Sequence, residues 1–332
     1  MDTLDQIILG KTRDSELDYY GHAFHRNIGI INSTEQEQLR NACVAIPGMG
    51  GIGSAAVAAL ARTGVGNFRI ADFGEYRLVN TNRQYGAATH TMGRNKAEVM
   101  AEIITSINPE ATVSIFTEPI TDFNIDDFLM GADIVVDGLD FFMPDTRSLL
   151  YSKARSFGLS VVLATQIGFT ATLHVFSPGG MTFDDFFQIK GGMKYEDKML
   201  SFLFGLTPGG LYKNYMDAGY IDIQRKRIPA LGITCQIASG MAATETISIL
   251  LERKKIKSTP HYSNFNAYLT KSQKGYLWLG NRNPMQQLKI WYAKNNGRIE
   301  LFKKRVKLIK TWLKRKVGLS GDKRIALTKS HV

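Results

Sequence analysis

The pattern of apolar and polar positions predicts alternating strands and helices over the first half of the chain. Short apolar runs at 43–46, 68–71 and 134–136 have the length and continuous hydrophobicity of parallel strands that are buried on both faces. Between the first two runs, residues 51–63 form an alanine-rich segment suited to a helix, and 93–108 carries apolar positions at helical spacing. The alternation predicts an α/β fold, Rossmann-like, with a mixed, mostly parallel sheet flanked by helices.

The second half of the chain is less regular. The alternating side chains of residues 170–176 predict a further strand. Residues 177–229 are irregular and aromatic, with several glycine-containing turns. A helix is expected at about 233–251, and 300–316 repeats apolar positions at helical spacing with cations between them. We expect four parts, which are an N-terminal helical segment (1–40), a Rossmann-like α/β domain (41–176), an irregular lobe with the completing helix and strands (177–285) and a basic amphipathic tail (286–332).

A glycine-rich turn follows the first predicted strand. Gly48, Gly50 and Gly53 fall on the spacing G-x-G-x-x-G, which suits a tight turn, close backbone approach to a phosphate, and close packing of the next helix. That helix begins near Gly51, and its unpaired N–H groups and dipole favour an anion. Asp72 ends the second predicted strand, where a ribose-binding acid is expected. The alternative is a glycine-rich turn without a ligand.

A polar cluster after Asp72 separates this chain from an ordinary dinucleotide dehydrogenase. Asn80, Arg83 and Gln84 follow within a dozen residues, and Lys96 lies on the next predicted helix. Two cations beside a glycine-rich turn suit a triphosphate whose oxygens must be neutralised while pyrophosphate leaves. The cluster therefore favours ATP over NAD, although Arg83 could instead form a surface ion pair.

Two acids follow the strand expected at 134–136. Asp137 and Asp140, in the sequence DGLD, would lie at the carboxyl edge of the sheet, where ligands of such folds bind. A carboxylate there suits Mg²⁺, which prefers oxygen ligands and substrate phosphates. The alternative for Asp137 is that it caps the next turn.

From about residue 24 to 251 the chain resembles the ThiF/MoeB/HesA superfamily, the bacterial relatives of ubiquitin-activating enzymes. The motifs that carry the resemblance are FHRNIGI, GMGGIG, ADFGEYRLVNTNRQ, GRNKAEVMAEIITSINPE and DGLDFF. The resemblance implies an eight-stranded mixed sheet in a homodimer. It also implies ATP-dependent adenylation of a carboxylate, usually the C-terminus of a ubiquitin-like protein.

The resemblance also assigns roles to single residues. Arg26 matches an arginine that reaches into the partner subunit's ATP site, and Asp72 matches the ribose-binding acid. Lys96 matches a lysine that holds the phosphates, and Asp140 matches the acid that places Mg²⁺. The glycine turn, which includes Gly51, lies under the nucleotide, so 41–176 is expected to be an ATP-binding Rossmann-like domain. The segment after 177 passes over the substrate, which implies a substrate-binding lobe at 177–285, and the alternative is an ordinary insertion that packs on the sheet. The triphosphate-facing residues are Asn80, Arg83 and Gln84.

Three features of the sequence differ from the pattern of this superfamily. Many members carry a second acid two residues after the first, where Gly74 stands here. Many bind zinc through two CxxC pairs, but this chain has only Cys43 and Cys235, so we expect no four-cysteine zinc site. Neither cysteine lies where thioester-forming members carry theirs. Adenylation without a thioester step is therefore the leading expectation, with Cys235 kept as an alternative nucleophile.

Charge is distributed unevenly along the 332 residues, whose net charge is +11. Residues 251–332 contain 21 Lys plus Arg against 3 acids, so the preceding 250 residues are mildly acidic. The helix predicted at 300–316 could lie on an anionic membrane surface, contact RNA, or dock on the body. No apolar run could span a membrane, and two unpaired cysteines fit a cytoplasmic protein, peripheral at the inner membrane face if the tail binds lipid.

Other functions remain open at this stage. The stretches NTNRQ and GRNKAEVMAE are also similar to the tRNA threonylcarbamoyladenosine dehydratases, which activate a nucleoside carboxylate. A nucleotide-binding scaffold at a membrane surface is a non-enzymatic alternative, and a nicotinamide oxidoreductase is the weakest. The expected partners are a second copy of the chain, a ubiquitin-like protein or peptide, and alternatively tRNA.

Overall fold

A computed structural model describes residues 18–295 of the chain. The chain divides into two compact units, 1–286 and 287–332. The elements considered below all belong to the first unit. The basic helix predicted at 300–316 lies outside the described residues, and so does the first part of the predicted N-terminal segment.

One eight-stranded sheet has the order β3-β2-β1-β4-β5-β6-β7-β8. The first five strands in this order are parallel, and the last three are antiparallel. The strands are β1 (Cys43–Pro47), β2 (Asn67–Ala71), β3 (Thr112–Phe116), β4 (Ile134–Asp137), β5 (Ser160–Ile167), β6 (Thr170–Phe176), β7 (His261–Asn266) and β8 (Lys271–Tyr276). The predicted α/β fold with a mixed, mostly parallel sheet is confirmed. Strand order reverses between β1 and β4, and such a switch point leaves a crevice outside the carboxyl ends of the strands.

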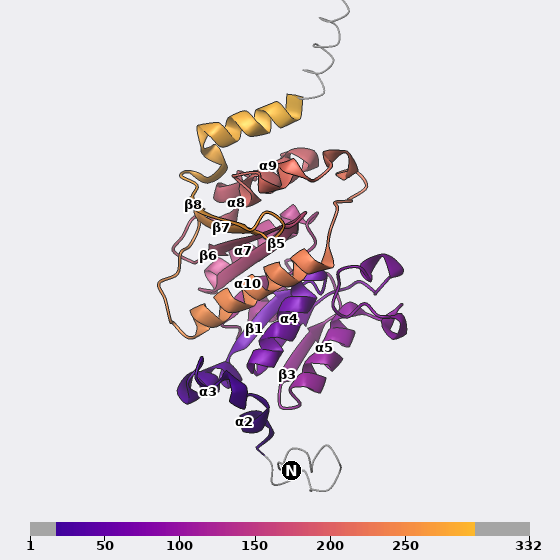
Figure 1. Cartoon of the computed structure of the whole chain (residues 1–332), viewed down its shortest axis with the longest axis vertical. Helices are drawn as coiled ribbons and strands as arrows, with labels where there is room; N and C mark the ends of the chain where they lie inside the picture. Colours follow the sequence, from indigo (N-terminus) through magenta and orange to yellow (C-terminus); the bar gives the residue numbers. More distant parts are fainter. Residues whose placement is uncertain (1–17, 296–332) are drawn as a thin grey trace, which may run out of the picture. The chain divides into compact units, whose positions relative to one another are not determined.

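Helices cover both faces of this sheet (Figure 1). On one face α4, α5 and α10 pack on Val44, Ile46 and Val136, and on the other face α6, α7, α8 and α9 pack around Val135 and Leu163. Alternation along each strand thus sends successive apolar side chains into two separate cores. The helices are α2 (Tyr19–Ala23), α3 (Ser33–Asn41), α4 (Gly51–Thr63), α5 (Lys96–Ile107), α6 (Ile125–Leu129), α7 (Pro144–Ser156), α8 (Phe183–Phe187), α9 (Tyr195–Leu206) and α10 (Gly232–Leu250).

The segment after β6 contains α8 and α9, which its turn-rich sequence does not predict. Phe183 and Phe187 of α8 and Phe202 of α9 are buried with ring centroids 4.9 to 5.9 Å apart, and Phe176 of β6 joins the cluster. Burial of several large rings compensates for the weak helical pattern of these short elements. The stretches 177–182, 188–194 and about 207–230 are irregular, and the last contains two short 3₁₀ turns.

Acid should destabilise the fold through His174 of β6, which is 1% exposed among Phe186, Phe187 and Tyr262. Burial lowers the pKa of His174 from 6.5 to about 3. The imidazole of His174 is therefore protonated below about pH 6.5 in the unfolded chain, but only below about pH 3 in the folded chain. The stabilising contribution is complete above pH 6.5 and is lost as the pH falls, by roughly 2 kcal/mol between pH 7 and pH 5.

Urea unfolding of the wild type and of His174→Leu at both pH values measures this effect. We expect the leucine variant to lose most of the difference between pH 7 and pH 5. The exposed His261 provides the matched control, because His261→Gln should keep the full wild-type difference. Equal pH dependence in wild type and His174→Leu would contradict the prediction.

Candidate nucleotide-binding site

The glycine turn joins the end of β1 to the start of α4. Gly48 has a φ of 92°, and a Cβ there would clash with the carbonyl oxygen of Gly138, at the end of β4. A Cβ on Gly53 would clash with the carbonyl oxygen of Gly48. Gly50 precedes α4 without a side-chain capping bond, and a Cβ there would meet only one atom, 3.9 Å away. The first N–H groups of α4 thus remain available to an anion at an open face of the turn.

Asp72 connects this turn to the loop after β2. Its Oδ2 accepts a hydrogen bond of 2.7 Å from the N–H of Met49, and its Oδ1 accepts one of 2.8 Å from the N–H of Gly74. An ionised carboxylate has about four acceptor sites, so two remain for a further donor such as a ribose hydroxyl. The two backbone bonds hold the carboxylate in place at the tip of β2.

Lys96, the first residue of α5, lies beside Asp72. Its backbone N–H donates to the carbonyl of Gly74 over 2.9 Å. A Cβ on Gly74 would stand 3.5 Å from the Nζ of Lys96 and 3.1 Å from the Oδ1 of Asp72. Asn95 caps α5 and donates to the carbonyl of Asp72 over 3.1 Å, which fixes the start of the helix. The glycine at position 74 leaves the space between the ammonium and the carboxylate open.

Arg83 and Gln84 approach the glycine turn from the loop after β2. The Cγ of Arg83 lies 3.6 Å from where a Cβ of Gly51 would stand, so the stem of the arginine passes the start of α4. Its Nη1 donates to the carbonyl of Val79 and to Asn82 Oδ1, leaving its remaining N–H groups for a ligand. Gln84 is 8% exposed, and its Oε1 has no hydrogen-bond partner among the described residues.

The side chain of Asn80 bonds to the backbone of its own loop. It ends the 3₁₀ turn Leu78–Asn80, is buried, and its Oδ1 accepts a 2.9 Å hydrogen bond from the N–H of Arg77. Its carbonyl accepts from the N–H groups of Arg83 and Gln84. The side chain of Asn80 thus shapes the loop that presents Arg83 and Gln84.

The two acids of DGLD have opposite surroundings. Asp137 is 1% exposed, and its carboxylate accepts from Arg147 Nε (2.8 Å), from Tyr151 OH (2.8 Å) and from the N–H of Leu139 (2.9 Å). With these bonds made it has no free face for a metal ion. Asp140 is exposed, and its Oδ1 accepts a hydrogen bond of 2.9 Å from the N–H of Phe142. Of the two, Asp140 alone fits an ion that is also held by nucleotide oxygens.

Arg147 is the residue that the sequence reasoning missed. Its side chain is 1% exposed and lies over the ring of Phe202 at 4.8 Å. Besides pairing with Asp137, it donates to the carbonyls of Leu139 (2.7 Å) and Asp140 (2.8 Å), and so fixes the loop after β4. Its position in α7 carried a signal, because residues 147, 150, 151 and 154 recur on one helical face that is otherwise apolar and buried.

Arg26 lies away from this group. It is exposed in the 3₁₀ turn His25–Asn27, and the next residue, Asn27, donates to the carbonyl of Thr63 at the C-terminal end of α4. Because α4 has 13 residues, about 20 Å separate that end from the glycine turn. Within one chain the structure does not bring Arg26 to the site, so its predicted role requires a second copy.

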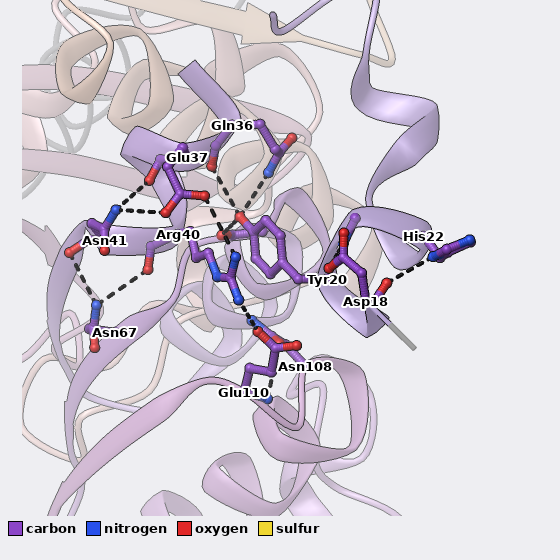
Figure 2. Close-up of polar contacts among 12 residues, drawn as sticks. Asp18, Tyr20, His22, Gln36, Glu37, Arg40, Asn41, Asn67, Asn108 and Glu110 are labelled. Atoms are coloured by element: carbon purple, nitrogen blue, oxygen red, sulfur yellow. Dashed lines mark hydrogen bonds and ion pairs between the residues drawn. The ribbon is translucent and has the colours of Figure 1, made fainter. Parts of the chain in front are cut away.

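The N-terminal elements next to Arg26 are firmly attached to the body, as Figure 2 shows. The hydroxyl of Tyr20 in α2 lies within hydrogen-bond distance of the carbonyls of Gly64 and Gln36, and Arg40 of α3 pairs with Glu110 at 2.6 Å. The position of the 3₁₀ turn that carries Arg26 is therefore set by the folded chain.

Cys235 is buried at the start of α10, and its Sγ lies 2.8 Å from where a Cβ of Gly51 would stand. Burial raises the pKa of the Cys235 thiol to about 11, with Arg83 opposing the shift. The thiol is therefore protonated at neutral pH and a poor nucleophile. Burial also raises the pKa of Cys43. Among residues 18–295 no three His, Cys, Asp or Glu side chains gather into a metal site, and no helix is long and apolar enough to cross a membrane.

The mixed, mostly parallel sheet, the glycine turn at its switch point and the polar groups around that turn define a Rossmann-like nucleotide-binding protein. The chain belongs to the ThiF family, whose sequence model matches residues 24–284.

Two proteins of known function are similar to this chain in sequence. The tRNA threonylcarbamoyladenosine dehydratase of Haemophilus influenzae is 35% identical over 146 residues, which cover 44% of this chain and 56% of that protein. The sulfur carrier protein ThiS adenylyltransferase of Escherichia coli is 29% identical over 143 residues, covering 43% and 56%. The chain thus spans about half the length of these relatives.

Solved structures extend the likeness of fold over most of the chain. PaaA has a TM-score of 0.61 at 16% identity and covers 83% of this chain and 92% of its own. The structure of E. coli MccB with ATP has a TM-score of 0.59 at 19% identity, covering 80% of this chain and 72% of that one. At these identities the likeness establishes the fold.

Proposed function

We propose that this chain transfers the AMP of ATP to a substrate carboxylate and releases pyrophosphate. The observation that carries the proposal is the convergence of Asp72, Lys96 and Arg83 on the glycine turn at the carboxyl edge of β1 and β2. Membership of the ThiF family, whose members include the ThiS adenylyltransferase of E. coli, supports the same chemistry.

Each group has a part in this reaction. The ribose binds Asp72, and the phosphates lie over Gly48, Gly50, Gly51 and Gly53 against the start of α4. Arg83 and Lys96 neutralise the phosphate oxygens as pyrophosphate leaves, Gln84 offers its amide to them, and Asn80 holds the loop. Asp140 holds Mg²⁺, which supplies further charge neutralisation. The substrate carboxylate attacks the α-phosphorus, so positioning and electrostatics suffice without a covalent protein nucleophile.

The leading substrate is the carboxyl end of a peptide or a ubiquitin-like protein. A row of neighbouring polar side chains crosses the sheet from the edge strand β8 to β5, formed by Gln273, Asn264, Thr172 and Thr165. Both amide atoms of Asn264 and the Oε1 of Gln273 are buried without a partner among the described residues. The row is roughly 14 Å long and matches about four residues of extended chain. Because Thr172 and Asn264 are 0% and 1% exposed, the segment over them has to move aside before main-chain groups of a substrate satisfy these amides.

Replacing Asn264 with leucine should separate stability from substrate recognition. Removing a buried, unpaired amide should raise the free energy of unfolding by about 1 kcal/mol and raise the KM for a peptide substrate at least tenfold, with ATP affinity unchanged. Urea unfolding and steady-state kinetics measure the two effects. The matched control is Thr246→Val on α10, which removes another buried, unpaired oxygen on the opposite face of the sheet. Asn264 has no part in recognition if both variants leave the KM unaltered.

We propose that Arg26 completes the site of the partner copy in a homodimer. Arg26→Ala and Asp140→Asn should each be inactive alone. A mixture allowed to exchange subunits should regain about a quarter of wild-type activity, because each heterodimer holds one intact site. Exchange kinetics after mixing measure this recovery. If the mixture stays inactive although native mass spectrometry detects heterodimers, Arg26 does not complete the site of the partner copy.

A nucleoside carboxylate on tRNA is the second candidate. Two observations favour it, which are the 35% identity to the dehydratase of H. influenzae over 146 residues and the strongly basic composition of residues 251–332. RNA binding of this kind weakens steeply with salt.

ATP–pyrophosphate exchange with the full-length protein tests the proposal. Exchange should appear with Mg²⁺ and a carboxylate substrate, and mass spectrometry should detect its acyl-adenylate. Peptides with free carboxyl termini, the same peptides amidated, and bulk tRNA distinguish the two candidates. Failure to bind ATP and to exchange pyrophosphate with every substrate would overturn the proposed function.

A further inference from the structure

A cavity of about 140 Å³ opens between α7 and the segment 177–184, away from the nucleotide site. It is lined by Leu159 and Val161, which lie at the beginning of β5. Because β5 runs parallel to β4 and β1, the beginning of β5 lies at the amino edge of the sheet, opposite the glycine turn. The cavity has room for several water-sized groups and none of the proposed adenylation residues lines it.

The cavity combines an apolar floor with a charged rim. Val161, Phe176 and Phe183 are buried and provide the floor. Arg155 and Asp184, both exposed, lie among the lining residues with opposite charges. Hydroxyl groups complete the lining, contributed by Ser148, Ser152, Ser177 and Thr182. This set suits a small molecule that carries both charges and an apolar part.

The two charged side chains are anchored to different groups of the rim. Arg155 Nη1 donates to the carbonyl of Gly180 over 2.9 Å, and Asp184 Oδ1 accepts from Ser148 Oγ over 2.6 Å. Ser148 and Arg155 are two helical turns apart on α7, or about 10 Å. Among the described residues Arg155 and Asp184 form no ion pair with each other. The ammonium and the carboxylate of a zwitterion each need a partner of opposite charge, and Asp184 and Arg155 supply one of each.

We propose that this cavity binds a free amino acid. Its carboxylate lies at Arg155, its ammonium lies at Asp184, and its side chain packs on Phe176 and Phe183. The rim hydroxyls supply further hydrogen bonds.

A short chain of buried contacts links the cavity to the nucleotide site. Tyr151 lines the cavity, and its hydroxyl donates to Asp137, which pairs with Arg147. Arg147 in turn holds the carbonyls of Leu139 and Asp140. Displacement of the Tyr151 ring by a bound molecule would therefore shift Asp137 and Arg147, and with them the loop that carries Asp140. The bound amino acid therefore changes the rate of adenylation, a consequence that rests on the proposed function, whereas the binding itself does not.

Isothermal titration of the full-length protein with each of the 20 standard amino acids, up to 10 mM, tests the binding. At least one should bind, and Arg155→Ala and Asp184→Asn should each weaken it at least tenfold while ATP affinity stays constant. Lys153→Ala, on the same helix but outside the lining and paired with Asp126, should bind like the wild type. The proposal is overturned if no amino acid binds a protein that still binds ATP, or if both rim variants bind normally.

ATP–pyrophosphate exchange with and without the bound amino acid tests the coupling. Tyr151→Phe keeps the ring but lacks the hydroxyl, so it should still bind the amino acid while the effect on exchange disappears. An exchange rate that ignores the amino acid in the wild type, or a Tyr151→Phe variant that responds fully, overturns the link. A protein without any exchange activity refutes the proposed function and leaves the titration result standing.

Discussion

Replacing Asp140 with asparagine should lower ATP–pyrophosphate exchange about 100- to 1,000-fold, the usual loss when one preorganised electrostatic contact to a reacting phosphate is removed. Asparagine keeps the oxygen that accepts from the N–H of Phe142 but loses the charge that holds Mg²⁺. Because Asp140 is exposed, the free energy of unfolding should change by less than about 0.5 kcal/mol. Exchange assays across a magnesium titration, together with urea unfolding, measure both effects.

The control for this variant is Asp145→Asn. Asp145 is also an exposed acid close by, at the start of α7, but it pairs with Lys198 on α9. Its replacement should leave exchange within about twofold of the wild type, since Asp145 is paired with Lys198 and has no part in the proposed site. If Asp140→Asn exchanges as fast as Asp145→Asn at every magnesium concentration, Asp140 is not the metal-binding group.

The local parts of this fold were predictable from the sequence. The buried strands β1, β2 and β4 are continuous apolar runs, and part of the glycine turn depends on neighbours, such as Gly53 against the carbonyl of Gly48. The contact of Gly48 with Gly138 is the exception, because it joins two strands that are distant in the sequence. The strands and the contact of Gly53 with Gly48 depend on residues that are close in the sequence. Their physical causes can therefore be read along the chain.

The distinction between Asp137 and Asp140 could not be read in this way. Both acids belong to DGLD, and the sequence reasoning placed both at the edge of the sheet. Their difference arises from Arg147 and Tyr151, one and two turns into α7, which turn inward and occupy Asp137. Only the packed position of α7 shows that one carboxylate is a structural ion-pair partner and the other is free for a ligand.

Long-range packing explains the other differences as well. The helices α8 and α9 depend on ring contacts among Phe176, Phe187 and Phe202, which no local periodicity reveals. The burial of Cys235, and with it the raised pKa of its thiol, results from α10 lying against α4. The role of Arg26 depends on a second copy of the chain and stays a prediction.

The buried pair of Asp137 and Arg147 should show the largest effect on stability. Asp137→Asn and Arg147→Met should each lower the free energy of unfolding by about 3 to 5 kcal/mol, because each leaves a buried charge without its partner. Arg147→Met should also reduce exchange, since the carbonyls of Leu139 and Asp140 lose their donor. Urea unfolding gives the stability of each variant, and exchange assays below the unfolding transition give the activity.

The double variant decides whether the cost comes from the unpaired charge or from lost packing. If each single loss reflects a buried charge without its partner, Asp137→Asn combined with Arg147→Met should cost much less than the two losses together, with a coupling above about 1 kcal/mol. Losses that add to within about 0.5 kcal/mol would contradict the pairing. The control pair is Arg69 and Asp127, where the carboxylate is 70% exposed. Asp127→Asn should cost less than about 1 kcal/mol, because water replaces the partner of an exposed ion.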